Sequence, residues 1–351
     1  MKYNSLFKVI LFCFMCAFIG TSCVKEGPIG PAGADGADGT NGTNGRDGVD
    51  GNVTCQVCHS GTNMEAKQAE FAMSIHSSGA IAVDYAGGRA ACARCHSHEG
   101  FTQFSVFNSV LGDITNPSAW NCNTCHGLHK SFEGKDYALR MTDPVVPIAP
   151  ANGVMDLKGN NNLCGTCHQS RSAEPGTDKP GENYTMTVRT YPHYSAQSNI
   201  LYGNGLAEIP GSVAYPAKAA SAHLTMDGGS CVGCHMGTFS ARQGGHSFIP
   251  SLKACNDCHG GTPSTNYNYG GVQTDTKAKL DQLRDKLLAL GLITETIEDG
   301  EVHYSPKPGS VPMKQAQAVY NYFGVKYDRS YGVHNPKYVK AILANSLDAL
   351  N

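Results

Sequence analysis

The clearest helical periodicity of apolar positions lies in the C-terminal part of the chain. In Thr276–Leu290, leucines recur at intervals of three and four residues, which places them on one face of a helix. Gly291 follows, where a left-handed residue can end that helix. Helices are also predicted for Pro312–Phe323 and for Pro336–Leu350, whose proline suits a first helical turn. We therefore expect residues 263–351 to form a helical cap.

A second apolar stretch, Val9–Ile19, lies near the N-terminus and follows Lys2 and Lys8. It has the length of a signal sequence and is shorter than the roughly 20 residues that a membrane-spanning helix needs. Residues 1–22 are therefore predicted to be a signal peptide. Small residues precede Cys23, as in a bacterial lipoprotein cleavage site, although Gly20 stands where leucine is usual. We predict lipidation of Cys23, with simple cleavage nearby as the alternative.

Glycine then recurs at every third position from Gly27 to Gly51. This spacing is typical of a collagen triple helix, whose axis has room only for glycine. Only Pro28 and Pro31 stiffen the tract, and Asp and Asn occupy many of its other positions. An extended, hydrated tether is therefore the favoured prediction, and trimerisation is the alternative. Residues 23–52 are interpreted as a lipid anchor followed by a collagen-like tether.

Residues 53–262 show little periodicity of either kind. A short helix is predicted around Met64–Ile75, turns are predicted at Asp143-Pro144 and Glu174-Pro175-Gly176, and little sheet is expected. The pattern C-x-x-C-H occurs six times here, at intervals too irregular for a solenoid repeat. The six motifs are Cys55-Cys58-His59, Cys92-Cys95-His96, Cys122-Cys125-His126, Cys164-Cys167-His168, Cys231-Cys234-His235 and Cys255-Cys258-His259.

C-x-x-C-H is the attachment signature of c-type haem. Each cysteine forms a thioether bond to the porphyrin, and the adjacent histidine becomes the proximal iron ligand. Zinc sites also use cysteine pairs, but zinc does not require a histidine directly after each pair. The sequence therefore predicts six covalently bound haem c groups.

Composition changes the expected core. Charged residues make up 16% of the chain and glycine accounts for 41 residues, so a conventional apolar core would be modest. We expect the haems to form the core of a mainly α fold with extensive irregular loops, and the chain without haem to fold poorly. Of the 15 cysteines, 12 lie in the motifs, and the others are Cys13, Cys16 and Cys23. The haem region therefore has no spare pair for a structural disulfide.

The remaining histidines are candidates for the sixth iron ligand. Six of the 14 histidines belong to motifs, which leaves eight others. Two are weaker candidates, because His98 is only two residues from His96 and His303 is predicted to lie in an acidic, exposed turn. Methionine is the competing ligand, with Met226 and Met236 near a motif. The predicted distal ligands are His76, His129, His193, His223, His246 and His334.

These motifs resemble those of bacterial multihaem c-type cytochromes. The tail Asp328-Arg329-Ser330-Tyr331-Gly332-Val333-His334-Asn335-Pro336-Lys337-Tyr338 is similar to the C-terminal segment of cytochromes related to ammonia-forming nitrite reductase and hydroxylamine oxidoreductase. That resemblance implies a distal-ligand role for His334. The segments Ser221-Ala222-His223 and Gly245-His246-Ser247-Phe248 also look like distal-ligand segments of this family. The nitrite reductases carry a C-x-x-C-K motif at the catalytic haem, and this chain has none.

The expected function is electron transfer along mostly bis-histidine haems at the cell envelope or cell surface. The alternative is a reductase of a small nitrogen or sulfur oxyanion with one open iron, and a filament subunit is a third reading that overlaps with the carrier. Cleavage before Cys23 would remove Lys2 and Lys8 and no acids, changing the formal charge from -2 to -4. We therefore expect redox partner proteins or extracellular acceptors, a lipid-anchored exported location and no nucleic acid.

Overall fold

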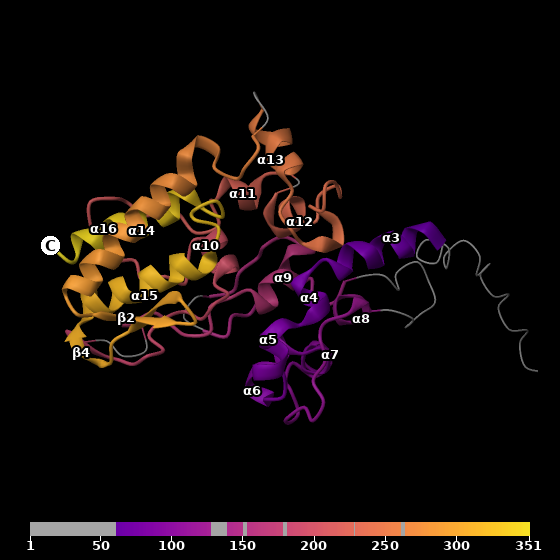
Figure 1. Cartoon of the computed structure of the whole chain (residues 1–351), viewed down its shortest axis with the longest axis horizontal. Coiled ribbons are helices and arrows are strands. Elements are labelled where there is room, and N and C mark those ends of the chain that lie inside the picture. Colours follow the sequence, from indigo (N-terminus) through magenta and orange to yellow (C-terminus); the bar gives the residue numbers. More distant parts are fainter. Residues whose placement is uncertain (1–60, 128–138, 150–152, 178–180, 228, 261–263) are drawn as a thin grey trace, which may run out of the picture. The chain divides into compact units, whose positions relative to one another are not determined.

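The computed structural model describes residues 61–127, 139–149, 153–177, 181–227, 229–260 and 264–351, and all of them fall in one compact unit (Figure 1). The predicted signal peptide, Cys23, the glycine-rich tract and the first motif, Cys55-Cys58-His59, lie outside the described residues, as does His129. None of the helices in the described ranges is both long enough and apolar enough to cross a membrane.

Short helices separated by irregular loops make up most of the chain before residue 260. This agrees with the predicted mainly α fold, because glycine, proline and asparagine interrupt every long run. These helices are α3 Gly61–Ala72, α4 Ile75–Ser78, α5 Ala80–Ala82, the π-helix Val83–Gly87, α6 Ala90–His96, α7 His98–Phe107, α8 Cys122–Cys125, α9 Asn161–Cys167, α10 Gln197–Tyr202, α11 Ala222–Thr225, α12 Ser230–His235, the 3-10 helix Gly245–Ser247 and α13 Leu252–His259.

Helices α6 and α7 pack unusually closely because of a glycine. A Cβ atom added at Gly100 in α7 would lie 2.4 Å from the backbone and side chain of Ala93 in α6. The Ser97 side chain accepts a hydrogen bond from the Gly100 backbone N–H and caps α7. This contact fixes the helix that carries one of the C-x-x-C-H motifs.

Three longer helices near the C-terminus pack on one another (Figure 1): α14 Val272–Ala289, α15 Met313–Asp328 and α16 Pro336–Asp348. Each begins within a few residues of its predicted start, and α15 runs five residues further than expected. Leu283, Phe323 and Ile342 are fully buried at their shared core. That core also includes apolar residues from earlier in the chain, namely Met186, Ile200, Leu206 and Ile209. The cap is therefore built jointly with the haem region.

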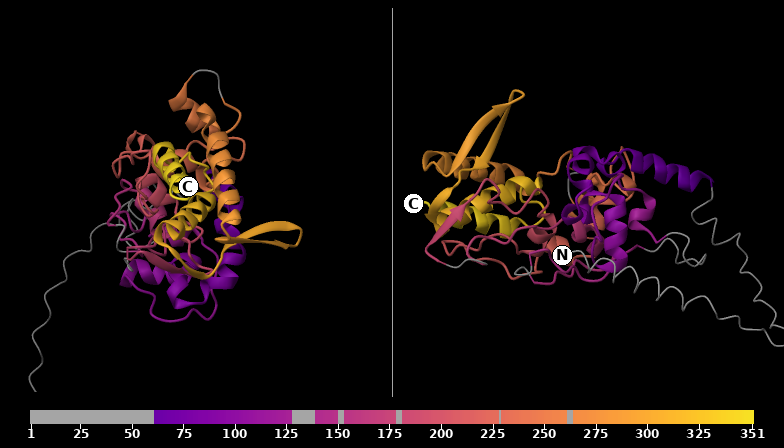
Figure 2. Two further views of the ribbon diagram at one scale, coloured as in Figure 1. Left: turned by 90° about the vertical axis from the view of Figure 1, so that its left-hand side faces the viewer. Right: turned by 90° about the horizontal axis from the view of Figure 1, so that it is seen from below.

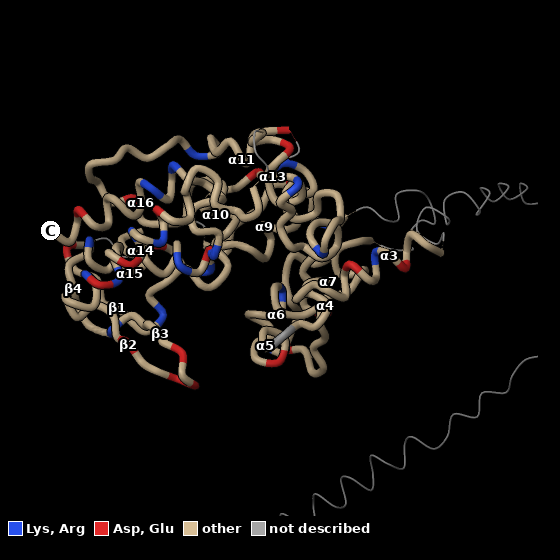
Figure 3. The backbone as a smooth tube through the Cα atoms, turned by 45° about the horizontal axis from the view of Figure 1, so that its top comes forward, with Lys and Arg blue, Asp and Glu red and all other residues tan. Residues whose placement is uncertain are grey.

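The structure contains two small sheets that the helical prediction did not include. Strands β2 Ile293–Glu298 and β3 Glu301–Pro306 form an antiparallel hairpin in which Glu298 pairs with Glu301. Its two-residue turn, Asp299-Gly300, has positive φ at both positions, as a type I′ hairpin turn requires. The hairpin is almost entirely exposed and stands away from the helices (Figure 2). Its acidic residues gather at the tip (Figure 3).

The second sheet links distant parts of the chain. Strand β1 Asn183–Met186 pairs antiparallel with β4 Gly309–Pro312, and Asn183 lies opposite Pro312. Met186 is 1% exposed and belongs to the core of the three C-terminal helices. This pairing holds the long loop before α10 against the cap.

Candidate functional site

Each described C-x-x-C-H motif lies on one short helix, either within it or with its histidine as the C-cap residue. Positions three and four residues apart share a helix face, so this spacing directs both cysteines and the histidine to one side. Capping fixes two of these helices: Asn121 and Thr124 form a capping box on α8, and the Ser251 side chain caps α13. The helices that carry the motifs are α6, α8, α9, α12 and α13.

A cavity of about 2110 Å³ adjoins all five of these motif helices. Its lining includes every cysteine and histidine of the five described motifs. Five of the predicted distal histidines line it as well, whereas His98 and His303 do not. The cavity is far larger than the few hundred to 1,000 Å³ or so typical of a single small-molecule site.

Each of the five described motif histidines faces one other histidine across this cavity. The separation of ring centres falls in a narrow range, from 6.0 to 6.4 Å. The five pairs are His96–His193 at 6.0 Å, His126–His246 at 6.3 Å, His168–His76 at 6.0 Å, His235–His334 at 6.4 Å and His259–His223 at 6.1 Å.

That separation is the one expected for two imidazoles on opposite sides of one metal. A metal–imidazole bond of about 2.0 Å on each side, plus about 1.1 Å from each nitrogen to its ring centre, gives about 6.2 Å. Stacked rings lie closer, as Tyr269 does on His259 at 4.4 Å. The residues therefore fit an iron held between the two histidines of each pair, with the two cysteines of the same motif beside it.

Burial keeps several of these rings neutral. Burial first, and then the charge of neighbouring histidines, lowers the pKa of His76, His193 and His235 to about 4 in each case. Burial also lowers the pKa of His168. Neutral imidazole is the form that binds a metal, so the site favours the required protonation state at neutral pH.

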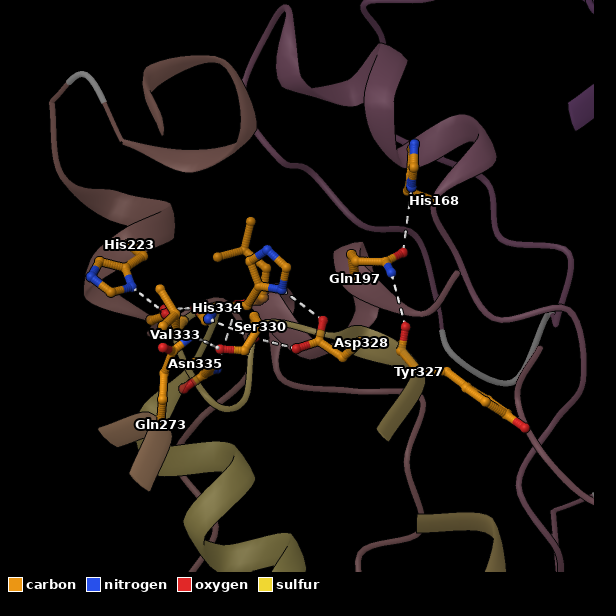
Figure 4. A network of polar contacts seen from close by, with 12 residues as sticks. His168, Gln197, His223, Gln273, Tyr327, Asp328, Ser330, Val333, His334 and Asn335 are labelled. Carbon is orange, nitrogen blue, oxygen red and sulfur yellow. Dashed lines mark hydrogen bonds and ion pairs between the residues drawn. The ribbon is translucent and has the colours of Figure 1, made fainter. Parts of the chain in front are cut away.

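Backbone and side-chain oxygens orient three of the rings through Nδ1 (Figure 4 shows two of them). His223 lies 2.6 Å from the Val333 carbonyl, His235 lies 2.7 Å from the Phe248 carbonyl, and His168 lies 3.4 Å from Gln197 Oε1. Because a carbonyl oxygen can only accept, Nδ1 carries the hydrogen in these rings. Nε2 is then unprotonated and available as a metal ligand.

His334 is held differently, by a carboxylate (Figure 4). Its Nδ1 lies 2.6 Å from Asp328 Oδ1, and the Asp328 side chain is fully buried. Burial alone would lower the pKa of His334, but the charge and hydrogen bond of Asp328 outweigh it and raise that pKa. Ser330 Oγ donates to the other oxygen of the same carboxylate.

Comparison with known proteins gave one curated relative. No protein-family model matches the chain. The chain is 25% identical over 313 residues to the C-type polyheme cytochrome OmcC of Geobacter sulfurreducens. This alignment covers 68% of this chain and 39% of that protein. The chain is a multihaem c-type cytochrome. It spans about two fifths of the length of this relative.

Among solved structures, the cytochrome matches the outer cell wall cytochrome OcwA. The TM-score is 0.49 at 18% identity, and the match covers 81% of this chain and 50% of that one.

The cytochrome binds haem c covalently. Within the described residues, no group of three or more His, Cys, Asp or Glu side chains is arranged to hold a bare metal ion. The side chain that faces His235 is that of His334 and not that of a methionine. Met226 and Met236 also line the cavity.

Two histidines of the cytochrome, His98 and His303, do not line the cavity. His98 Nδ1 lies 2.7 Å from Thr124 Oγ1. His303 lies on the exposed strand β3, opposite Thr296, rather than in the turn where the sequence suggested it. Both were the weaker candidates on sequence grounds, and neither lines the cavity.

Residues that orient the ligands were missed by sequence reasoning. Gln197, Phe248 and Asp328 each contact a ring from a different segment, and no motif marks them. Phe248 also packs against His76 at 5.0 Å, and Trp120 packs against the same ring at 5.4 Å. The available signal was position, because Asp328 and Phe248 both lie in segments that resemble distal-ligand segments.

Proposed function

We propose that this cytochrome transfers electrons along six haem c groups, most of them held between two histidines. The single observation that supports this most strongly is the set of five ring pairs at 6.0 to 6.4 Å. In each pair the motif histidine is the proximal ligand and the facing histidine is the distal one. The cysteines of the same motif form the two thioether bonds. The sixth haem belongs to Cys55-Cys58-His59, with His129 as its proposed distal ligand.

Closed coordination determines the chemistry. A haem iron with two histidine ligands exchanges one electron without binding a substrate. Burial lowers the pKa of His76, His193 and His235, and hydrogen-bond acceptors at Nδ1 fix the orientation of His223, His235 and His334. The haems of the five described motifs would therefore carry electrons without binding a substrate.

Contacts between motifs indicate the order of the haems. The Sγ atom of Cys95 lies 3.8 Å from the Thr166 carbonyl oxygen, and that of Cys167 lies 3.8 Å from the Arg94 carbonyl oxygen, so α6 and α9 meet at their motif cysteines. The Val232 backbone N–H donates to Asn161 Oδ1 at 2.7 Å, which joins α12 to α9. Because the motif cysteines would carry the edges of their porphyrins, we propose that the haem of the His168 motif adjoins those of the His96 and His235 motifs.

A third neighbour adjoins the same haem on its distal side. Phe248 packs on both His76, at 5.0 Å, and His246, at 6.1 Å. His246 faces His126, so the haem of that motif lies beside the haem of His168. The Ser251 backbone N–H donates to the Cys234 carbonyl oxygen at 2.8 Å, which joins α12 to α13 and supports a position of the His259 haem beside that of His235. We propose a branched arrangement with the His168 haem at its centre.

The location follows the sequence prediction. We propose that the protein is exported, anchored through a lipid on Cys23 and held at the cell surface by the collagen-like tether. Its partners would be redox proteins or extracellular electron acceptors, and a homo-oligomer or filament is compatible with haems near the surface. OmcC is a C-type polyheme cytochrome, and the extracellular role is proposed here for this chain alone.

The function is tested by haem counting and voltammetry. A pyridine haemochrome assay and intact mass should give six haems per chain. Protein on an electrode should then show reversible one-electron waves whose size is unchanged by added nitrite or sulfite. A catalytic current with either anion would instead support a reductase with one open iron.

A further inference from the structure

The Nδ1 environments of the paired histidines are not equivalent. Two rings, His223 and His235, meet neutral backbone carbonyls, and His168 meets an amide oxygen. Only His334 has a carboxylate within hydrogen-bond distance, at 2.6 Å, among the rings whose partners the structure describes. The neutral contacts orient their rings without adding charge.

The carboxylate of Asp328 is placed so that its charge acts on the ring. Its side chain is 0% exposed, so water does not screen it. Ser330 Oγ donates to it and also accepts from the His334 backbone N–H at 3.3 Å, which fixes the geometry (Figure 4). Within the described residues, the ion pair of Asp328 is with His334 and with no Lys or Arg.

A second carboxylate near a paired histidine offers a direct comparison. Glu70 Oε2 lies 3.6 Å from His246 Nδ1, too long for a strong hydrogen bond. Glu70 is also engaged by the Lys67 ammonium at 2.8 Å and by the His246 backbone N–H at 2.9 Å. Its charge is therefore largely balanced by Lys67. The two carboxylates differ in distance, in counter-charge and in the haem that they adjoin.

We infer that Asp328 is a positioning and tuning residue that makes the haem of the Cys231-Cys234-His235 motif the lowest in reduction potential of the five described. A carboxylate that accepts the Nδ1 hydrogen raises the basicity of the ligating imidazole. A more basic ligand, together with a buried negative charge, stabilises the oxidised iron relative to the reduced iron. The inference depends on the proposed ligand role of His334.

The consequence for electron flow comes from the position of this haem. It lies between the haem of His168 and the haem of His259 in the proposed order. Its reduction is then the least favourable step on the route to the His259 haem. Electrons would pass readily among the haems of His96, His126 and His168, and more slowly to the haem of His259.

The test is spectropotentiometric titration of the holoprotein carrying Asp328→Asn, which removes the charge and keeps the shape. The lowest of the haem midpoints should rise by at least the equivalent of a tenfold change in its reduction equilibrium, which is 59 mV for one electron. The other midpoints, the haem count and the number of low-spin haems should stay unchanged. Glu70→Gln is the matched control and should shift every midpoint by less than the equivalent of a threefold change.

Two further variants separate the ways of failing. Asp328→Glu restores the charge and should return the midpoint toward its original value. If Asp328→Asn fails to incorporate haem, Ser330→Ala takes its place: loss of the Oγ–H donor leaves the carboxylate charge less balanced, so the lowest midpoint should fall. Unchanged midpoints in Asp328→Asn would overturn the inference. If His334→Ala then still opens one iron, the ligand assignment stands without the tuning role; if it opens none, the proposed coordination fails as well.

Discussion

The ring that faces each motif histidine decides whether an iron bound there keeps a free position. In all five described pairs that ring is another histidine, and none of the five distal rings is shared between two motifs. The pairs also join segments far apart in the chain, such as His76 with His168. Coordination is therefore a property of the fold rather than of any single motif.

A pair of alanine variants tests this at the level of single residues. His223→Ala should convert one haem from low-spin to high-spin, because it removes the ring that faces His259 at 6.1 Å. Added cyanide should bind that haem. His303→Ala is the control, since His303 is exposed on β3, and its spectrum should match the wild type. Ferric EPR and absorbance spectra measure both. A spectrum of His223→Ala without high-spin haem would contradict the pairing.

The sequence predicted the members of these pairs better than the pairs themselves. The five histidines that face motif histidines could be named as candidates because few histidines lie outside the motifs and each stands near a helix end or a motif. Which ring faces which motif depends on tertiary contacts, such as those made by Phe248, that leave no local pattern. Asp328 is visible in the sequence only as the first residue of a resembling segment, since its effect requires burial that sequence spacing does not reveal.

At the scale of elements, the motif helices are too short to be stable alone, so their packing matters. Isolated helices under about 12 residues are marginal in water. Helix α6 has seven residues and is held against α7 by the close approach at Gly100. The same helix contributes Arg94, whose guanidinium lies 3.8 Å from the centre of the Phe104 ring in α7.

Gly100→Ala should therefore damage one haem site selectively. The new methyl group would lie 2.4 Å from Ala93, so α6 must move, at a cost of about 1–3 kcal/mol in the free energy of unfolding. We expect a lower thermal midpoint and loss of up to one haem per chain. Gly112→Ala is the control, because nothing lies within 4 Å of its added Cβ. Equal thermal midpoints in the two variants would count against the role of this contact.

The long periodic helices were predicted, as was the helix around Met64–Ile75, which overlaps α3, but the two sheets were not. The leucine spacing located α14 and Pro336 located the start of α16, because burial against one core imposes a helical period. The hairpin β2–β3 was missed although Asp299-Gly300 is a strong turn signal. It packs on little, so the apolar pattern that identifies buried elements is weak there.

At the scale of the whole molecule, the proposed branch predicts which haems sense one another. Replacing His76 by Met should raise the potential of the central haem, since a thioether ligand favours the reduced iron. That haem can then be reduced alone, which removes its unpaired electron. EPR lines of three neighbouring haems should sharpen.

His223→Met applies the same change to the haem of His259, whose proposed neighbour is the haem of His235. In that variant the EPR lines of one neighbouring haem, that of His235, should sharpen. Equal numbers of affected haems in the two variants would contradict the branch and favour a linear order.

The central claim is that the described motifs bind closed, bis-histidine haems, and low-temperature EPR of the oxidised wild-type protein tests it most directly. We predict low-spin ferric signals from at least five haems per chain, unaltered by cyanide or nitrite. High-spin signals amounting to two or more haems per chain, shifting when either ligand is added, would contradict it, because at least one described pair would then be open.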